Sequence, residues 1–488
     1  MVSLTEQKQA VYYNYVGGEW TKSSSKELLE SRNPATGEFI SYAQSSTVRD
    51  VEEAIDSVYK AFHHSDWGYN PKRRYEALLG LAQKIEGNLE HLARVLTMEQ
   101  GKTIRESRIE LAGCVDTLKY FAGAARTVFG RSIQLEPNSY GVIAKEPIGV
   151  VGIISPWNWP ALLMVRELAP ALAAGNGVIV KPASLTPGIS VEIFKLIAEV
   201  PHFTKGIVSI VTGPGRSIGA AMGTSKKIDM ISFTGDTSTG KTIMELATSN
   251  IKKLALELGG KSPNVVFADA NLDKAIPLIG RSIFISAGQI CMAGSRLLVH
   301  ESIKDEVISR LKSYAENLKV ANGLLESTDM GPLVSQSQLD LVEEYCEIGR
   351  REGKIITGGY RLTGGDYDKG YFFAPTIIDD LSANCRVVRE EIFGPVLAVQ
   401  TFSNDEEALA MANDTDFGLS AGVWTTDLNR AMRMSKGIQA GTVWINTYNK
   451  NFPEAEFGGY KQSGLGRTRG IDGLMEYCET KHIHFEID

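Results

Sequence analysis

Ile148-Gly149-Val150-Val151-Gly152-Ile153-Ile154 is an almost wholly apolar run, and it is the first of several runs that decide the fold. Short apolar runs rich in β-branched residues are typical of strands that are buried on both faces. Similar runs stand at 177–181, 207–211 and 230–234, and helical patterns separate them at 161–174, at 190–200 and from residue 217. Strands that alternate with helices of about 10–15 residues predict a parallel α/β sheet.

The rest of the chain extends this pattern on both sides. Apolar residues recur at helical spacing across 48–127, and a further strand is predicted at 142–147. A second α/β series begins near residue 262 and runs to about 446, and the alternating tail at 480–487 predicts an exposed strand. A chain of 488 residues exceeds what one core usually organises, so we expect two or three domains.

The composition is that of an ordinary globular enzyme, with 43% apolar and 22% charged residues. The net charge of −7 argues against nucleic acid or an anionic membrane as a partner. No signal peptide is visible, and no apolar run reaches the length of about 18 residues that spans a membrane. The sequence contains neither an HExxH nor a CxxC motif, so no metal site is predicted. The scattered cysteines form no disulfide framework, and a reducing, cytoplasmic location is expected. They are Cys114, Cys291, Cys346, Cys385 and Cys478.

Cys291 and Glu257 are the candidate reacting pair. Cys291 stands in a small-residue stretch at 288–296, and Glu257 stands in a second glycine-rich stretch at 256–261. A thiolate is the strongest nucleophile among the side chains, and a nearby carboxylate can act as general base toward a thiol or a water. A single cysteine is more often a small core residue, but the flanking glycines and the second motif favour covalent acyl chemistry.

A rival interpretation comes from residues 235–242, which fit the GxxxxGK[ST] pattern of the P-loop in nucleotide hydrolases. An apolar strand precedes the pattern, a helix follows it, and an apolar run that ends in Asp269 lies downstream. A glycine-rich turn that opens a helix also holds the pyrophosphate of a dinucleotide through the same N–H groups. The pattern indicates a phosphate ligand and leaves open whether the protein is a P-loop NTPase or a dinucleotide enzyme.

Further motifs follow one another in a fixed order. They are Ile153-Ile154-Ser155-Pro156-Trp157-Asn158-Trp159-Pro160, Lys181-Pro182-Ala183-Ser184, Phe233-Thr234-Gly235, Glu257-Leu258-Gly259-Gly260-Lys261, the Cys291 stretch, Glu390-Glu391-Ile392-Phe393-Gly394-Pro395 and Phe457-Gly458-Gly459-Tyr460-Lys461-Gln462-Ser463-Gly464. This ordered set resembles the hydrolytic, non-acylating branch of the NAD(P)-dependent aldehyde dehydrogenase superfamily over nearly the whole chain. Members of that family do not hydrolyse ATP, so the resemblance makes the P-loop match a coincidence.

The resemblance implies an α/β fold in three parts. A Rossmann-like cofactor domain is expected at 1–124 and 148–258, and an α/β catalytic domain at 259–460. A small β projection for oligomerisation is expected at 125–147 and 470–488. Its exposed sheet edge invites pairing with a second subunit, so we expect a homodimer or homotetramer.

The resemblance also implies roles for the residues. Cys291 would attack an aldehyde to form a thiohemiacetal and then a thioester, Asn158 would stabilise the oxyanion, and Glu257 would activate the hydrolytic water. Lys181, which is counted with these catalytic residues, would also hold the adenosine ribose, and Glu391 would hold the nicotinamide ribose. The predicted cofactor-binding residues are Ile154, Trp157, Lys181, Ser184, Gly215, Phe233, Gly235, Asp236, Leu258, Glu391 and Phe393.

Two positions depart from the family pattern. Many NAD-preferring relatives carry a glutamate where this chain has Ser184, so NADP should be admitted as well as NAD. Arg166 stands where semialdehyde dehydrogenases bind a substrate carboxylate, but Ile285 replaces their second arginine. We therefore expect a largely apolar tunnel with broad preference for apolar or aromatic aldehydes, and a semialdehyde dehydrogenase that uses Arg166 is the alternative. The predicted tunnel residues are Trp159, Leu163, Arg166, Met292 and Phe457.

Overall fold

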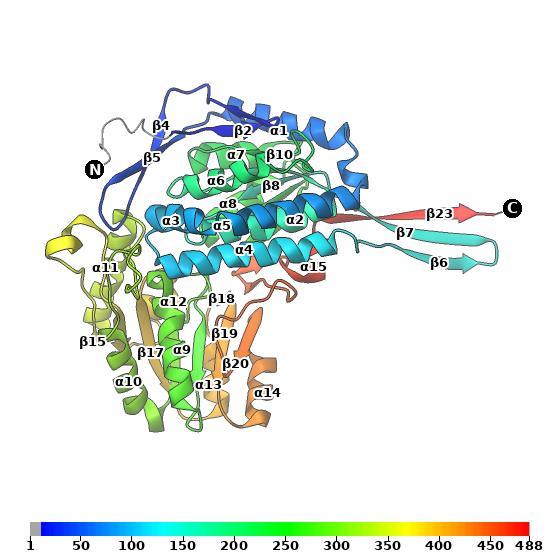
Figure 1. Cartoon of the computed structure of the whole chain (residues 1–488). Helices are drawn as coiled ribbons and strands as arrows, with labels where there is room; N and C mark the ends of the chain where they lie inside the picture. The colour runs from blue at the N-terminus through cyan, green and yellow to red at the C-terminus, as the bar shows by residue number, and fades with distance from the viewer. Residues whose placement is uncertain (1–10, 488) are drawn as a thin grey trace.

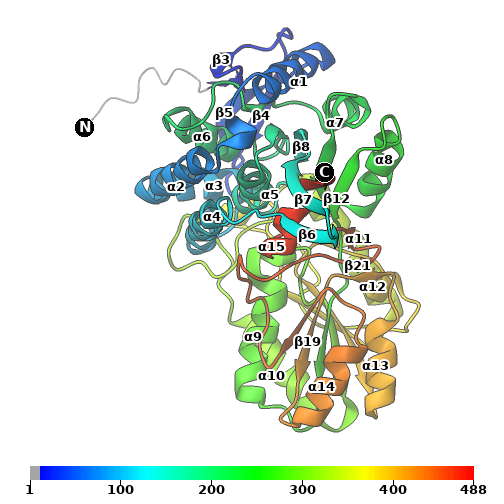
Figure 2. The same ribbon diagram turned by 90° about the vertical axis from the view of Figure 1, so that its right-hand side faces the viewer.

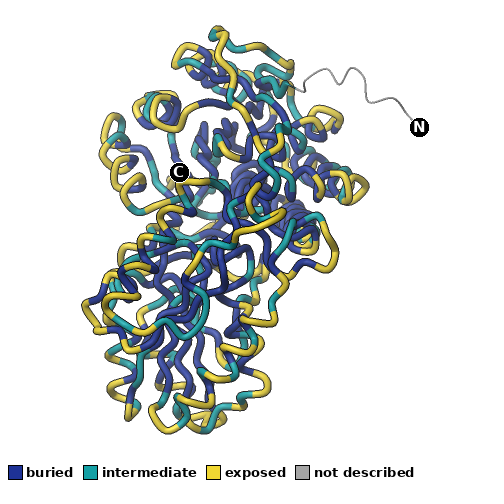
Figure 3. The backbone as a smooth tube through the Cα atoms, turned by 90° about the vertical axis from the view of Figure 1, so that its left-hand side faces the viewer, coloured by how far each residue is buried: buried dark blue, intermediate teal, exposed yellow. Residues whose placement is uncertain are grey.

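The computed structural model describes residues 11–487. Figure 1 shows two α/β lobes, one above the other, and a long β arm that extends away from the upper lobe. Figure 3 shows that the buried backbone is concentrated in the interior of each lobe. The α/β class predicted from the alternating strands and helices is confirmed.

The first lobe is built on an eight-stranded sheet in the order β22-β12-β11-β8-β9-β10-β2-β3. Its five central strands are parallel, whereas β22, β2 and β3 run antiparallel to their neighbours. The strand order reverses direction beside β8, and in such sheets a crevice opens at the carboxyl ends of the strands at that point. The strands are β2 (Asn14–Val16), β3 (Glu19–Thr21), β8 (Val150–Ile154), β9 (Gly177–Lys181), β10 (Val208–Ile210), β11 (Met230–Thr234), β12 (Lys253–Glu257) and β22 (Gly464–Leu465).

Helices cover both faces of this sheet because alternate strand residues point in opposite directions. Val151 and Ile153 of β8 pack in the core that includes α2, α4, α5 and α6, whereas Val150 and Ile154 pack with α1 and α7. The predicted helical segment at 48–127 is confirmed as four helices. The helices of this lobe are α1 (Val48–His63), α2 (Pro71–Gly87), α3 (Leu89–Gln100), α4 (Ile104–Ala124), α5 (Pro160–Ala174), α6 (Pro187–Ala198), α7 (Gly215–Thr224), α8 (Thr237–Ala247) and α15 (Gly470–Met475).

The second lobe contains a seven-stranded sheet in the order β15-β16-β17-β14-β13-β19-β20, parallel except for β15. In Figure 2, α9 and α10 lie on one side of this sheet and α13 and α14 lie on the other. The strands are β13 (Pro263–Val266), β14 (Arg296–His300), β15 (Lys354–Thr357), β16 (Thr376–Asp379), β17 (Val396–Phe402), β19 (Ser420–Trp424) and β20 (Thr442–Ile445). The helices are α9 (Leu272–Phe284), α10 (Lys304–Glu316), α11 (Gln336–Glu352), α12 (Arg386–Arg389), α13 (Asp405–Asn413) and α14 (Leu428–Gly437).

The arm is a three-stranded antiparallel sheet of β6 (Arg131–Glu136), β7 (Ser139–Pro147) and β23 (Cys478–Glu486) (Figures 1 and 2). Every residue of β6 is exposed, and the predicted exposed strand in the tail is confirmed as β23. The homodimer or homotetramer remains a prediction. Short strands complete the structure: β1 (Val11–Tyr12), β4 (Leu28–Arg32) and β5 (Phe39–Gln44) form one sheet, and β18 (Phe417–Gly418) pairs with β21 (Tyr460–Lys461).

The three-part domain division also remains a prediction, and the packing of α15 bears on its boundary at residue 470. Leu474 of α15 lies in the core of the first lobe.

Two kinds of feature are absent from the part of the chain that the structure describes. None of the helices within residues 11–487 is long and apolar enough to cross a membrane. Across the same residues, no group of three or more His, Cys, Asp and Glu side chains is placed to hold a metal ion. The cytoplasmic location and the absence of a nucleic-acid partner stay predictions from composition.

Asn176 is a buried polar connection in the first lobe, and it yields a stability prediction. Its Oδ1 accepts the Gly149 N–H at 2.9 Å, and its Nδ2 donates to the carbonyls of Ala171 and Tyr477 at 3.0 Å each. Asn176→Ala should lower the free energy of unfolding by about 3 kcal/mol, because these buried groups lose their partners. Thermal unfolding measures the loss. Asn317→Ala, at an asparagine that bonds only within its own helix end, should leave the midpoint nearly unchanged.

Candidate functional site

Two cavities meet at Cys291. One has a volume of about 590 Å³ and opens between α4, α5, α9 and the 447–453 loop; we call it the tunnel. The other has a volume of about 830 Å³ and lies along the carboxyl ends of β8, β9, β11 and β12; we call it the cleft. Asn158, Leu163 and Cys291 line both cavities. A molecule in the tunnel and a molecule in the cleft would therefore approach each other at the Cys291 thiol.

Cys291 stands in a tightly constrained loop. The loop follows α9 and a short 3-10 turn, Ile285–Gly288, in which Ser286 and Ala287 have φ angles of 49° and 54°. Cys291 is partly exposed, whereas the other four cysteines are buried. Desolvation raises the pKa of the Cys291 thiol to about 12, and the nearby Arg166 guanidinium opposes this shift. The thiol therefore needs a proton acceptor before it can react.

Asn158 and Glu257 are placed around this thiol. Asn158 follows β8, and its Nδ2 donates a hydrogen bond to the carbonyl of Gln289 at 3.0 Å, two residues before the cysteine. Glu257 ends β12, lines the cleft with Cys291 and is buried. Burial raises the pKa of Glu257 to about 8, while Arg166 acts in the opposite direction. The structure thus brings a thiol, an amide donor and a carboxyl group of raised pKa to one junction.

Most of the predicted cofactor residues line the cleft, because parallel strands end at the same edge of the sheet. Leu258 is the exception, since it packs behind the wall, where a Cβ on Gly240 would lie 2.6 Å from its side chain. The residues that do line the cleft are Ile154, Trp157, Lys181, Ser184, Gly215, Phe233, Gly235, Asp236, Glu391 and Phe393.

Several of these side chains carry groups that suit a ribose or a ring. Burial lowers the pKa of Lys181 to about 8, and its Nζ donates to the Pro182 carbonyl at 2.8 Å. Glu391 accepts the Gly260 N–H at 3.0 Å, and burial raises its pKa to about 7. The rings of Trp157 and Phe393 meet edge to face, with centroids 5.3 Å apart. Hydroxyl-binding groups and aromatic rings therefore alternate along the cleft.

The segment 235–242 does not have the geometry of a P-loop. Helix α8 already begins at Thr237, so Gly240 and Lys241 lie inside the helix and no long loop remains to enclose phosphates. The Asp236 carboxylate caps the helix by accepting the Thr239 N–H at 2.9 Å, and a negative charge there opposes a phosphate. Lys241 points to Gln462, with a hydrogen bond of 2.9 Å. The NTPase alternative loses its structural basis.

The wall of the tunnel is largely apolar, but charged side chains also reach it. Trp159, Leu163, Arg166 and Met292 line it as predicted, but Phe457 does not reach the wall. Phe457 is buried beneath two guanidinium groups, which lie 5.7 Å (Arg166) and 5.6 Å (Arg469) from its ring centroid. Apolar residues and one glycine form much of the remaining wall: Ile109, Gly113, Leu162, Leu278, Ile285, Ile290 and Pro453. The polar and charged residues of the wall, which the sequence did not assign to it, are Asp116, Thr117, Lys274, Arg281, Ser282, Thr447, Tyr448, Asn449, Lys450, Asn451 and Arg469.

Arg166 is held by a buried network at the inner end of the tunnel. Its Nε donates to Glu167 at 2.8 Å, and one Nη donates to the Thr234 hydroxyl at 3.2 Å. The other oxygen of Glu167 accepts hydrogen bonds from Tyr477 at 2.7 Å and from Ser232 at 3.2 Å. Burial alone would lower the pKa of Arg166, but the negative charges of Glu167, Glu257 and Cys291 together raise it above its ordinary value. Arg166 is therefore a fixed, charged group.

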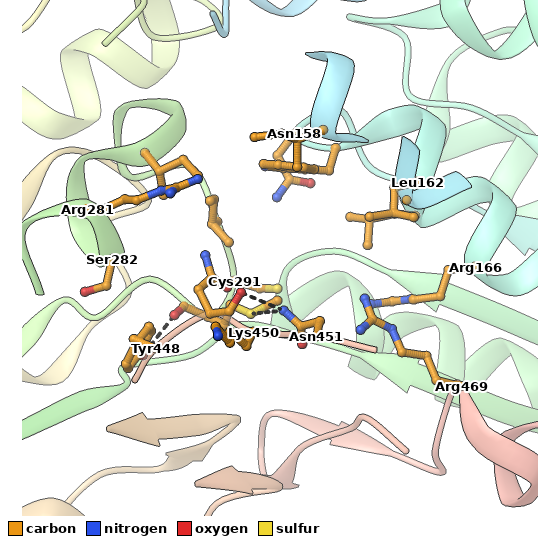
Figure 4. Close-up of a pocket in the computed structure, with 18 of the residues that line it drawn as sticks. Asn158, Leu162, Arg166, Arg281, Ser282, Cys291, Tyr448, Lys450, Asn451 and Arg469 are labelled. Carbon is orange, nitrogen blue, oxygen red and sulfur yellow. Dashed lines mark hydrogen bonds between the residues drawn. The ribbon is translucent and has the colours of Figure 1, made fainter. Parts of the chain in front are cut away.

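Arg469 lies beside Arg166, and sequence reasoning missed it. Figure 4 shows the two guanidinium groups next to each other in the same pocket as Cys291. Burial, and to a smaller extent the positive charge of Arg166, lower the pKa of Arg469 to about 10. Unlike Arg166, Arg469 donates no hydrogen bond to the protein within residues 11–487. No spacing pattern pointed to it, because it reaches the tunnel only through the packing of α15 on α5.

Comparisons with known proteins agree with this geometry. The model of the Aldehyde dehydrogenase family matches residues 20–483. A betaine aldehyde dehydrogenase of Bacillus subtilis (strain 168) is 41% identical over 473 residues, which cover 96% of this chain and 96% of the relative. An aldehyde dehydrogenase of Emericella nidulans is 39% identical and covers 97% of this chain and 95% of the relative.

The same family appears among solved structures. The crystal structure of a betaine aldehyde dehydrogenase from Staphylococcus aureus in complex with NAD+ has a TM-score of 0.96 and 38% identity. The alignment covers 97% of this chain and 95% of that chain. The family match therefore spans both lobes, both cavities and the junction between them. From its sequence, its fold and the placement of its site, the chain belongs to the aldehyde dehydrogenase family.

Proposed function

We propose that this protein oxidises an aldehyde to its carboxylic acid with NAD or NADP, through covalent intermediates on Cys291. The observation that carries the proposal is the position of Cys291 where the tunnel meets the cleft, with Asn158 and Glu257 beside it. The proposed catalytic residues are Cys291, Glu257, Asn158 and Lys181. Aldehyde in the tunnel and dinucleotide in the cleft would then meet at one sulfur atom.

The cleft fits a dinucleotide. Gly235 lines the cleft, and its lack of a side chain leaves room for the Phe233 ring, which would lie 2.4 Å from a Cβ at this position. Lys181 and Glu391 would bind ribose hydroxyls, and Trp157 and Phe393 would flank the nicotinamide end. The relative from Staphylococcus aureus binds NAD+. When bound, the cofactor supplies the acceptor for the hydride that leaves the substrate carbon.

The chain's own groups account for the remaining steps. The Cys291 thiol gives its proton to a base, and its sulfur bonds to the aldehyde carbon while the Asn158 amide and the Cys291 N–H stabilise the oxyanion. Loss of hydride restores the carbonyl and gives a thioester. Glu257 then takes a proton from water as that water attacks, the carbon–sulfur bond breaks, and the acid leaves. Glu257 suits this role because its raised pKa makes it a better base when ionised.

Glu257→Gln should separate the two half-reactions. Glutamine keeps the shape but accepts no proton, so one equivalent of reduced cofactor forms rapidly and the steady-state rate then falls about 100-fold or more. Stopped-flow absorbance measures both phases. In the wild type the hydrolytic step should speed up as pH rises through about 8, because Glu257 ionises there, and the variant should lack this rise. Cys291→Ala is the control that should show no burst; a full burst in it would assign the nucleophile elsewhere.

Ser184 supports the use of both cofactors. Its hydroxyl donates to the Gly213 carbonyl at 2.9 Å, and it occupies the cleft position where many NAD-preferring relatives have a glutamate. The neighbouring Arg216 also lines the cleft and adds a positive charge. A 2′-phosphate would meet no carboxylate from residue 184, so NADP is admitted.

Ser184→Glu should shift the preference toward NAD by about 1–3 kcal/mol, or about 5- to 150-fold, since a carboxylate repels a 2′-phosphate and binds a free 2′-hydroxyl. The ratio of kcat/KM for the two cofactors measures this shift. Ser184→Gln, which has the same length without the charge, is the matched control and should shift the ratio less. A wild type that already rejects NADP more than about 100-fold would contradict the argument from Ser184.

For the substrate, the arginine pair favours an aldehyde that carries an anionic group. Two guanidinium groups lie within the tunnel close to the nucleophile, and Arg469 keeps its N–H donors free of protein acceptors among the described residues. A carboxylate would neutralise both charges and accept their hydrogen bonds. This observation favours the semialdehyde alternative over the broad apolar preference expected from the sequence, because Arg469 supplies the second arginine that Ile285 does not.

The same charges oppose a quaternary ammonium substrate. The relatives from Bacillus subtilis and Staphylococcus aureus are named betaine aldehyde dehydrogenases. A quaternary ammonium group is usually bound by a cage of aromatic rings. Here the inner end of the tunnel presents Arg166 and Arg469, whose positive charges repel such a group. We therefore expect this chain to differ from those relatives in the charge of its substrate.

A substrate screen tests this proposal. The kcat/KM of the wild type for succinate semialdehyde should exceed those for hexanal and betaine aldehyde by at least about tenfold, or about 1.4 kcal/mol. Arg469→Leu should lower the value for the acid aldehyde about 10- to 100-fold through loss of a charge-assisted contact, and change that for hexanal less than about threefold. Arg281→Leu is the control for the loss of one positive charge from the cavity, because Arg281 is an exposed arginine that lines the same cavity. Equal or higher activity on hexanal and benzaldehyde would restore the apolar preference.

A further inference from the structure

The carboxylate of Glu106 holds the loop that carries the nucleophile. Glu106 lies on α4 and is buried. Its Oε1 accepts the backbone N–H of Ser286 at 2.6 Å. Its Oε2 accepts the N–H and the hydroxyl of Thr103 at 2.7 and 2.9 Å, where the helix begins. Both oxygens are therefore fixed, and one of them reaches from the first lobe into the cysteine loop.

The loop needs such support because its backbone is strained. Ser286 and Ala287 have φ angles of 49° and 54°, in the left-handed region that L side chains rarely adopt, and Gly288 follows with a φ of 74°. Non-glycine residues persist in this region only where their surroundings hold them. The Glu106 bond to Ser286 supplies a contact at the first of these three residues.

A continuous set of hydrogen bonds leads from this contact to the oxyanion donor. The Ser286 carbonyl accepts the Gln289 side-chain amide at 2.9 Å, and the Gln289 side-chain oxygen accepts the Val334 N–H at 2.9 Å. The Gln289 carbonyl in turn accepts the Asn158 amide at 3.0 Å. A displacement of Ser286 would thus be passed to Gln289, and from there to both Cys291 and Asn158.

Glu110, one turn further along α4, holds the opposite side of the site. Its Oε1 accepts the N–H groups of Ala161 and Leu162 at 2.8 and 3.1 Å, in the first turn of α5, directly after Asn158 and Trp159. Its Oε2 is 2.6 Å from the Nζ of Lys102. The same helix therefore supports the nucleophile loop through one carboxylate and the oxyanion side through the other.

We propose that Glu106 is a positioning residue, which sets the Cys291 thiol against the Asn158 amide, while Glu110 fixes the Asn158 side from the same face of α4. The inference deepens the proposed function and rests on it for the reacting roles of Cys291 and Asn158. Neither glutamate touches the reacting atoms. They act by setting the distance and direction between the Cys291 thiol and the Asn158 amide, which do touch the reacting atoms.

Glu106→Gln keeps the side-chain volume but replaces one acceptor oxygen with an amide that cannot accept the Thr103 or Ser286 hydrogen bonds. The burst rate of reduced cofactor should fall about 10- to 100-fold, since misplacement of a reacting group by about 1 Å has effects of this size. The NAD dissociation constant should not change. Glu99→Gln is the matched control: Glu99 is also buried and accepts two N–H groups, of Gly188 and Ile189, but it lies on neither cavity. It should lower thermal stability and leave the burst rate unchanged.

A double-mutant cycle distinguishes positioning from a general loss of structure. In an Asn158→Ala background, Glu106→Gln should lower the burst rate by less than about threefold, because the amide that Glu106 aligns is absent. An equal loss in both backgrounds, or an unchanged burst rate, would overturn the proposal. Should Glu106→Gln not fold, Glu106→Asp keeps both acceptors, shortens their reach and enters the same cycle.

The rate at which iodoacetamide alkylates Cys291, located by mass spectrometry, gives a readout that needs no turnover. The other four cysteines are buried, so the reaction selects this thiol. Glu106→Gln should change the alkylation rate at least about threefold, and Glu99→Gln should not. An unchanged rate would count against Glu106 as the support of the loop. A wild type without a burst on any aldehyde would refute the aldehyde chemistry, and the alkylation rate would still decide whether Glu106 holds the loop.

Discussion

The hydrogen bond from the Asn158 amide to the Gln289 carbonyl joins the two lobes at the point of reaction. Asn158 follows β8 at the edge where the first sheet opens its crevice, and Gln289 stands in the loop before β14 of the second sheet. The first lobe supplies the Asn158 amide and Glu257, and the second lobe supplies Cys291. The relative placement of the lobes is therefore part of the site, and the rigid strands and helices behind each partner keep the reacting groups aligned.

Buried charge is the second constraint on this junction. Arg166, Arg469 and Glu257 lie together with Cys291 in a region from which water is largely removed, so each charge acts strongly on its neighbours. Glu167 neutralises Arg166, and Tyr477 and Ser232 satisfy the remaining oxygen of Glu167. Such a network is stable only when it is completely paired. Arg469 donates no hydrogen bond to the part of the chain that the structure describes, and under the proposed function a substrate carboxylate would pair with it.

Much of the fold was predictable from the sequence. The strands at 177–181 and 230–234 match β9 and β11, because fully buried parallel strands leave uninterrupted apolar runs. The structure brings Cys291, Glu257 and Asn158 to one junction, since glycine-rich motifs after strands converge at one edge of a sheet, and their catalytic roles remain predictions. Leu258 and Phe457 were expected to line the cleft and the tunnel, respectively. Each belongs to a segment next to its cavity but is not among the residues that line it. The polar and charged part of the tunnel wall was not predictable, because helix α4, helix α9 and the 447–453 loop form it only through tertiary packing.

The three residues between Pro156 and Pro160 act as a partition. Trp157 lines the cleft, Trp159 lines the tunnel, and Asn158 lies between them and contributes to both. An indole on each side means that each cavity carries its own intrinsic fluorophore, adjacent in sequence but facing different ligands. Reduced nicotinamide absorbs where tryptophan emits, so a reduced cofactor bound in the cleft would quench tryptophan emission. Lys102, whose ammonium lies 4.0 Å from the Trp159 ring centroid, gives the second fluorophore a distinct electrostatic environment. The two indoles therefore lie in different surroundings although only one residue separates them: Trp157 meets the Phe393 ring, and Trp159 lies beside an ammonium group.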